Sequence, residues 1–188
     1  MPLRHHGHAA RIRAGSLTVA AVAAVLTGCA AATHTTSSPG GPSVNPSATP
    51  LTDDETKAQI VDLAKEIVAV AALQEATGGY GIQSCNDQGD PPYLGQVDLN
   101  FQIPADVDEN GYLHNVAAAM TAHGWAAGSA PGRYLAGITL NKNGVTASIG
   151  PNVAHPHIGN IELTGQCRDM TDHHHQDIPS VDITAELH

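Results

Sequence analysis

The stretch GQVDLNFQI, residues 95–103, alternates apolar and polar side chains along its length. Successive side chains of a β-strand point to opposite faces of the sheet, so this pattern predicts a strand with one buried and one solvated face. One-sided burial is typical of antiparallel sheets, because parallel sheets are usually covered on both faces. Residues 95–103 therefore predict an antiparallel sheet that packs on one face only.

Further short strands are expected around this one, at residues 80–85, 134–140, 145–149 and from 161 to near Cys167. Asn143-Gly144 lies between two apolar runs, which is a strong signal for a β-hairpin. If the strands are neighbours, their polar positions line one hydrogen-bonding face: Asp98, Asn100, Gln102, Thr139, Thr146, Ser148, Glu162, Thr164 and Gln166. A solvated face without any partner has the same pattern.

Two helices are expected on the apolar side of this sheet. Thr52 and Glu55 have the spacing of a capping box, and apolar residues then recur at helical intervals as far as Ala71. We expect Gly78-Gly79 to end this helix. The second helix is expected at residues 112–123. The element order α-β-β-α-β-β-β predicts an α+β fold with a single antiparallel sheet of about five strands and two helices on one face.

The N-terminal 28 residues have the features of a lipoprotein signal peptide. Arg4, Arg11 and Arg13 precede an apolar run, and Leu26-Thr27-Gly28-Cys29 has small residues before a cysteine. This lipobox predicts lipidation of Cys29 and a membrane-anchored chain on the extracytoplasmic face of the cell membrane. An uncleaved anchor helix is the alternative, although the apolar run is short for about 30 Å of hydrocarbon.

Residues 29–50 are rich in Thr, Ser, Pro, Gly and Ala, which predicts a flexible linker between the lipidated cysteine and a globular domain at 51–168. Five basic and eighteen acidic residues follow Cys29, so the formal charge of that part is −13. Phosphate backbones repel such a chain, and we expect no nucleic-acid partner. An envelope protein or a polar glycan suits this chemistry better than an acyl chain.

Cys85 and Cys167 remain if lipid occupies Cys29. Disulfides persist in oxidising compartments, so we expect these two residues to be bridged at their strand ends. Two free or metal-bound thiolates are the alternative, but the C-x-x-C spacing that usually marks such sites is absent.

Several motifs resemble the mycobacterial lipoproteins called LppJ and LppV. They are SCNDQGDPPY at 84–93, VDLNF at 97–101, HGW at 123–125 and GQCR at 165–168. The resemblance covers about residues 52–168 and the lipobox. It implies mycobacterial origin, lipid anchoring and a Cys85–Cys167 bridge, and it supplies neither an activity nor catalytic residues.

Two groups of residues are candidate metal ligands. Asp106, Asp108 and Asn110, followed by Gly111, reproduce the first half of a calcium loop, but Ala117 stands where the chelating Glu is expected. Capping of the next helix explains the same residues. The histidine clusters, with His155 and His157 in one and His173 and His175 in the other, suit zinc or copper. A solvated loop and a His/Asp-rich tail at 169–188 are the alternative.

Catalytic patterns are weak in this sequence. Ser148 stands in a run that lacks the first glycine of a nucleophile elbow, and no glycine-rich phosphate loop opens a helix. We therefore expect no catalytic residues and no cofactor. The sequence favours a membrane-anchored, non-enzymatic binding or interaction module of the cell envelope, with metal binding as the alternative function.

Overall fold

The computed structural model describes residues 48–130, 137–174 and 179–188. Its elements are α1 (Asp53–Val70), β1 (Gln74–Ser84), β2 (Tyr93–Gln102), α2 (Glu109–Ala122), β3 (Ala126–Ala127), β4 (Ile138–Lys142), β5 (Val145–Pro151), β6 (Ile158–Thr164), β7 (Val181–Asp182) and a short 3₁₀ helix, η1 (Thr184–Glu186). The signal, the lipobox with Cys29, most of the linker and His175 lie outside the described residues.

The strands form one antiparallel sheet in the order β3-β4-β5-β6-β2-β1-β7. The predicted α+β class is confirmed. The sheet has seven strands rather than about five, because β3 and β7, of two residues each, pair on its outer edges. Two residues are too short to produce an alternating pattern, so sequence periodicity cannot find such strands.

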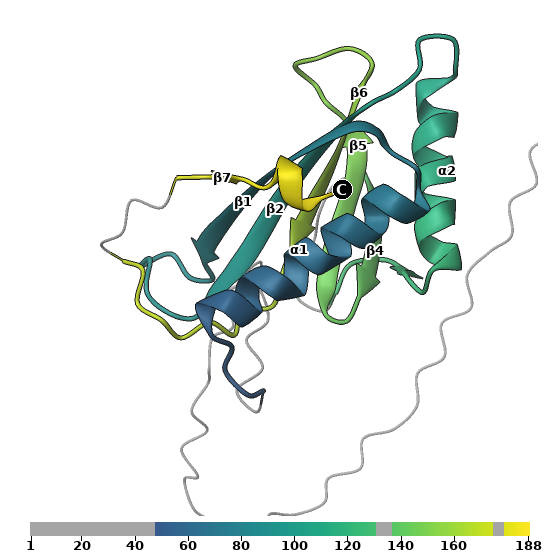
Figure 1. Cartoon of the computed structure of the whole chain (residues 1–188). Helices are drawn as coiled ribbons and strands as arrows, with labels where there is room; N and C mark the ends of the chain where they lie inside the picture. Colours follow the sequence, from purple (N-terminus) through teal and green to yellow (C-terminus); the bar gives the residue numbers. More distant parts are fainter. Residues whose placement is uncertain (1–47, 131–136, 175–178) are drawn as a thin grey trace, which may run out of the picture. The chain divides into compact units, whose positions relative to one another are not determined.

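Both helices pack on one face of the sheet, as expected. Figure 1 shows α1 lying diagonally across the strands, and α2 at its side. The helix α1 contacts mainly β2, whereas α2 contacts β4 and β5. The apolar positions of β2 (Val97, Leu99 and Phe101) are buried in the core beneath the helices. The hairpin at Asn143 is also confirmed, since Lys142 pairs with Val145 across a two-residue turn.

The first helix is shorter than its sequence predicts. It ends at Val70, and Gly78 and Gly79 lie inside β1 rather than at a helix end. A Cβ on Gly78 would lie 3.0–3.2 Å from side-chain atoms of Leu187, Ile183 and Leu99. Such contacts are tighter than most real Cβ contacts, so glycine here makes room for the C-terminal segment, which sequence-local signals do not reveal.

The C-terminal segment is part of the domain, which corrects the expected tail at 169–188. The strand β7 pairs with β1, and the side chains of Ile183 and Leu187 are 0% and 4% exposed within the main core. Asp169 and His173 are buried as well. Asp and His predominate in the first half of this stretch, so its composition resembles a solvated tail, although Val181, Ile183 and Leu187 stand at odd positions near its end.

Cys85 and Cys167 form a disulfide. Cys85 directly follows β1, and Cys167 stands three residues after the end of β6, so both lie near strand ends as predicted. Together with Leu94 they form a small buried cluster separate from the main core. Leu94 alternates with the core-facing residues of β2, which places this cluster on the face opposite the helices.

Candidate functional site

The strongest candidate site begins at the N-terminus of α1. The Thr52 hydroxyl accepts a hydrogen bond from the Glu55 N–H, and the Glu55 carboxylate accepts one from the Thr52 N–H at 2.9 Å. These bonds stabilise the charged carboxylate and lower the pKa of Glu55. The predicted capping box is thereby confirmed, and it holds Asp53 as the first residue of the helix.

Asp169 lies beside this helix start because its backbone is paired on both sides. Its N–H donates to the Tyr93 carbonyl at 3.1 Å and its carbonyl accepts from the Tyr93 N–H at 2.7 Å, while it bridges to Leu51 on the other side. The residue is fully buried. Oδ1 of its carboxylate accepts a hydrogen bond from the Thr171 N–H at 2.9 Å, whereas Oδ2 has no hydrogen-bond partner among the described residues.

His173 completes the group. Its side chain is 4% exposed, and its ring packs edge-on against Tyr93 with 4.9 Å between ring centroids. Nε2 lies 3.5 Å from Asp169 Oδ2 and 3.7 Å from Asp53 Oδ1. One nitrogen and two carboxylate oxygens thus lie within 4.8 Å of one another, and we call these three residues the Asp53–Asp169–His173 cluster.

Negative charge predominates around this cluster. The described residues contain no ion pair of Lys or Arg with Asp53 or Asp169. The nearby Tyr80 has its pKa raised to about 12, first by burial and then by the charges of Asp169 and Asp53. An anionic phenolate is unfavourable beside two carboxylates, so this site favours a cation.

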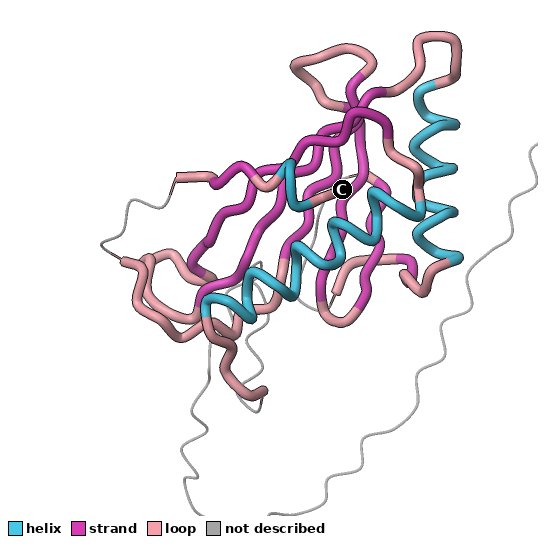
Figure 2. Tube along the Cα trace, viewed as in Figure 1, coloured by secondary structure: helices cyan, strands magenta, loops and turns pink. Residues whose placement is uncertain are grey.

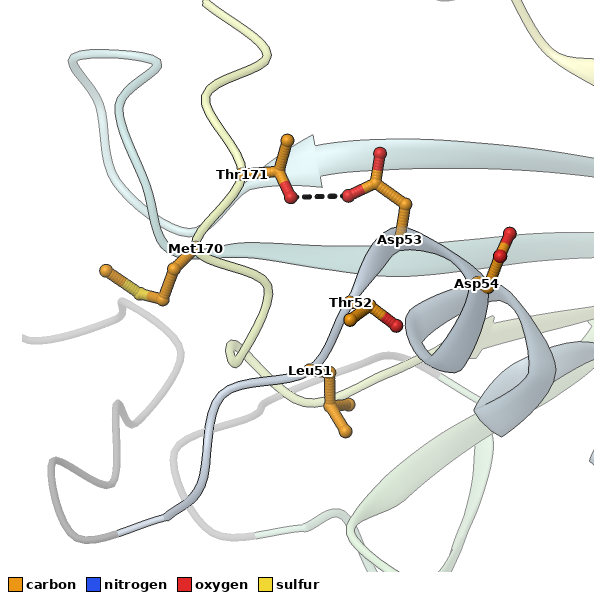
Figure 3. Close-up of a pocket in the computed structure, with 6 residues that line it drawn as sticks. All are labelled: Leu51, Thr52, Asp53, Asp54, Met170 and Thr171. Carbon is orange, nitrogen blue, oxygen red and sulfur yellow. Dashed lines mark hydrogen bonds between the residues drawn. The ribbon is translucent and has the colours of Figure 1, made fainter.

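An open pocket adjoins the cluster at the start of α1. It is lined by Leu51, Thr52, Asp53, Asp54, Met170 and Thr171. Figure 3 shows the Thr171 hydroxyl directed at the Asp53 carboxylate, to which it donates a hydrogen bond. The Asp53 side chain is 51% exposed, so the cluster has a solvent side although its other two members are buried.

The second candidate site is the polar face of the sheet, opposite the helices. Registered pairing places Asp98 beside Glu162, Glu162 beside Ser148, and Ser148 beside Thr139. The expected polar platform is therefore present as neighbouring rows on β2, β6, β5 and β4. One carboxylate lies directly opposite another in this row, which costs stability unless something compensates the charges.

Hydrogen bonds hold several side chains of this face in place. Gln96 donates to the Glu162 carboxylate at 3.3 Å, and Asn152 donates to Asn100 Oδ1 at 2.9 Å. Burial raises the pKa of Asp98. Thr146 and Thr164 are covered, and the Thr146 hydroxyl accepts a hydrogen bond from the Ala130 N–H, so the accessible part of the face centres on β2 and β6.

The predicted calcium ligands lie in the loop before α2. Asp108 is the N-cap of that helix, and its carboxylate accepts a hydrogen bond from the Gly111 N–H at 2.6 Å. Asp106 and Asn110 are exposed. Among the described residues, these three belong to no group of metal-ligand atoms that converge. The geometry matches the capping alternative, and α2 begins at Glu109 rather than Tyr112 because of this cap.

His155 and His157 are exposed in the loop between β5 and β6, and they too join no converging group within the described ranges. Figure 2 shows this loop and the loop before α2 at the same end of the sheet, where the Ile103 N–H donates to the His157 carbonyl at 2.8 Å. Of the second histidine pair, His173 is in the cluster, and His175 lies outside the described residues.

The partners of His173 were only partly detectable in the sequence. Asp169 stands four residues before it, at the start of the His/Asp-rich stretch. Asp53 stands 120 residues earlier and carries the ordinary signature of a helix N-terminus. Nothing local distinguishes a carboxylate in the first turn of a helix from a metal ligand, so only the tertiary contact of α1 with the segment after Cys167 identifies the cluster.

The sequence of this disulfide-linked α+β domain matches a family of lipoproteins. The model of the family described as "Putative lipoprotein LppJ" matches residues 52–186. The chain is 48% identical over 180 residues to proteins of that description from Mycobacterium bovis and Mycobacterium tuberculosis. The match spans 94% of this chain and 93% of each relative, so the chain belongs to the LppJ family. No solved structure matches it.

Within the described residues, none of the helices has the length and apolar character needed to cross a membrane.

Proposed function

We propose that this protein is a non-enzymatic binding module that lipid on Cys29 holds at the extracytoplasmic face of the cell membrane. Membership of a lipoprotein family supports the anchor. The Cys85–Cys167 disulfide is typical of a compartment outside the reducing cytosol. Both described cysteines are bridged, which removes them as nucleophiles and favours binding over catalysis.

The Asp98–Glu162 pair is the reason for proposing the polar face of the sheet as the binding surface. Two carboxylates opposite each other on neighbouring strands repel, and burial already disfavours the charged form of Asp98. A guanidinium or ammonium group from a partner would neutralise both carboxylates and form charge-assisted hydrogen bonds. The Asp98–Glu162 pair therefore favours a partner with basic side chains.

The composition of the same face favours a protein partner over a glycan. The residues in register around the carboxylate pair are amides and hydroxyls such as Gln96, Ser148 and Thr139, and none of them is aromatic. Basic protein surfaces are recognised through such acidic faces by electrostatic complementarity. The charge of −13 after Cys29 extends the attraction beyond direct contact. An envelope protein with a basic surface is the proposed partner.

Photo-crosslinking tests this surface in the full chain. A photoreactive amino acid at Gln96, on the polar face, is expected to capture an envelope protein in the membrane fraction. Asp98→Lys should reduce the yield at least tenfold, because it repels a basic partner. The matched control is Asp62→Lys, which changes the net charge equally on the exposed side of α1 and should keep the yield. Equal yields in both variants, or capture of glycan alone, would contradict the proposal.

The anchor leads to a separate prediction. Cys29→Ala removes the thiol that takes the lipid, so incorporation of a tagged palmitate into the chain is expected to be lost completely. Cys85→Ala in the same assay should retain the label, because that cysteine belongs to the disulfide. Fluorescence of the tag on a gel, corrected for protein amount, measures the effect. Persistent labelling of the Cys29→Ala chain would show that lipid is attached elsewhere or that the chain is anchored differently.

A further inference from the structure

We propose that the Asp53–Asp169–His173 cluster binds a divalent transition-metal cation, and that Zn²⁺ is its best match. This inference concerns a different part of the domain from the polar sheet face, and it stands or falls independently of that surface. It also differs from the metal sites expected at Asp106, Asp108 and Asn110 and at His155 and His157, whose side chains do not converge among the described residues.

The spacing of the three ligand atoms fits a tetrahedral ion. Zn²⁺ binds imidazole nitrogen and carboxylate oxygen at about 2.0–2.2 Å, so two ligand atoms of one tetrahedral ion lie about 3.4 Å apart. His173 Nε2 lies 3.5 Å from Asp169 Oδ2 and 3.7 Å from Asp53 Oδ1. The remaining separation is at most 4.8 Å, and it involves the partly exposed Asp53, which has room to adjust.

The buried carboxylate of Asp169 favours a cation in the cluster. Asp169 is fully buried, and its Oδ2, directed at the other two side chains, accepts no hydrogen bond from the described residues. A buried carboxylate oxygen without a hydrogen bond is costly. One divalent ion would neutralise the two carboxylates and accept the imidazole nitrogen as a third ligand. A bound ion would therefore supply a partner for Asp169 Oδ2 and balance the negative charge of the two carboxylates.

Neighbouring residues hold the three proposed ligand side chains in place, as a metal site requires. The Thr171 N–H holds Oδ1 of Asp169, and the Thr171 hydroxyl donates to Asp53. Tyr93 packs edge-on against the His173 ring. Contacts of this kind fix the orientation of the side chains that bind a metal ion, and they recur in functional metal sites. The open pocket at Asp53 supplies an entry path and leaves room for water as a fourth ligand (Figure 3).

The ligand set selects the kind of metal. One imidazole and two carboxylates suit Zn²⁺ and its neighbours in the first transition series, whereas Ca²⁺ requires six to eight oxygen ligands. A bound ion would join the start of α1 to the segment that follows the disulfide. It would therefore have a structural role, because it would cross-link two segments at the N-terminal end of the domain.

Zinc titration of the full chain in detergent, after removal of metal with EDTA, tests this proposal. Calorimetry is expected to show one site, and Zn²⁺ but not Ca²⁺ should raise the midpoint of thermal unfolding. Asp53→Ala should weaken Zn²⁺ binding at least tenfold. Asp54→Ala is the matched control, because this neighbouring acid lines the same pocket but is not in the cluster, and it should bind as the wild type does.

A second pair of variants separates the cluster from the surrounding histidines. His173→Gln should abolish the zinc-dependent rise of the midpoint, whereas His174→Gln should keep it, since His174 is exposed and outside the cluster. Circular dichroism checks that each variant is folded. Absence of Zn²⁺ binding to the wild type, or equal binding by Asp53→Ala and Asp54→Ala, would overturn the proposal.

Discussion

Loss of the Cys85–Cys167 disulfide is expected to lower the free energy of unfolding by about 4 kcal/mol. The bridge joins residues separated by 82 positions, and a cross-link over such a loop removes much of the conformational entropy of the unfolded chain. It also fastens the end of β1 to the segment after β6, although β2 lies between these strands. Measured effects of native disulfides are commonly about 2–5 kcal/mol.

Urea unfolding measures this effect on a Cys29→Ala background, which removes the third thiol. The reference chain should unfold at a much lower urea concentration in the presence of reductant than in its absence. Replacement of both Cys85 and Cys167 by Ala should produce the lower midpoint without reductant, and reductant should not change it further. A double variant with the midpoint of the oxidised reference would contradict the prediction.

Ile183→Ala is expected to destabilise the domain by about 2–5 kcal/mol, the usual cost of truncating a buried isoleucine. The side chain is 0% exposed and packs in the main core beside Gly78, although it belongs to the stretch that looks like a tail in the sequence. A cavity there would separate the C-terminal segment from the inner strands. The unfolding midpoint in urea, compared with that of the wild type, measures the loss.

Val181→Ala is the matched control for this prediction. Val181 lies in the same segment and pairs with Tyr80 through the backbone, but its side chain is 47% exposed. Its truncation should change the free energy of unfolding by less than about 0.5 kcal/mol. Similar midpoints for Ile183→Ala and Val181→Ala would show that the C-terminal segment does not pack in the core in solution.

Much of the fold was predictable where the signal is local. The alternation in β2 correctly indicates a sheet with one buried face, the Thr52–Glu55 spacing marks the start of α1, and Asn143-Gly144 marks a hairpin. Each of these signals depends on residues within a few positions of one another. The end of α1 was wrongly predicted because Gly78 and Gly79 are usual helix terminators, whereas here they accommodate a segment more than 100 positions later.

The candidate sites divide in the same way. The polar face of the sheet was predictable, since alternation alone places Asp98 and Glu162 on the solvated side. That these two residues are direct neighbours depends on the order and register of β2 and β6. The Asp53–Asp169–His173 cluster was not predictable as a set. Its members come from the start of α1 and from the segment after β6, and Asp53 also has a local role at the helix start.

By itself, the sequence determined the α+β class, the strand and helix signals, the acidic charge and the cysteines available for a bridge. These properties follow from periodicity, composition and residue chemistry, which act over a few neighbouring positions. Only the tertiary structure decided that Ile183 belongs to the core and that Asp53, Asp169 and His173 converge. Both depend on contacts between distant segments, because burial and charge are set by what the folded chain brings together.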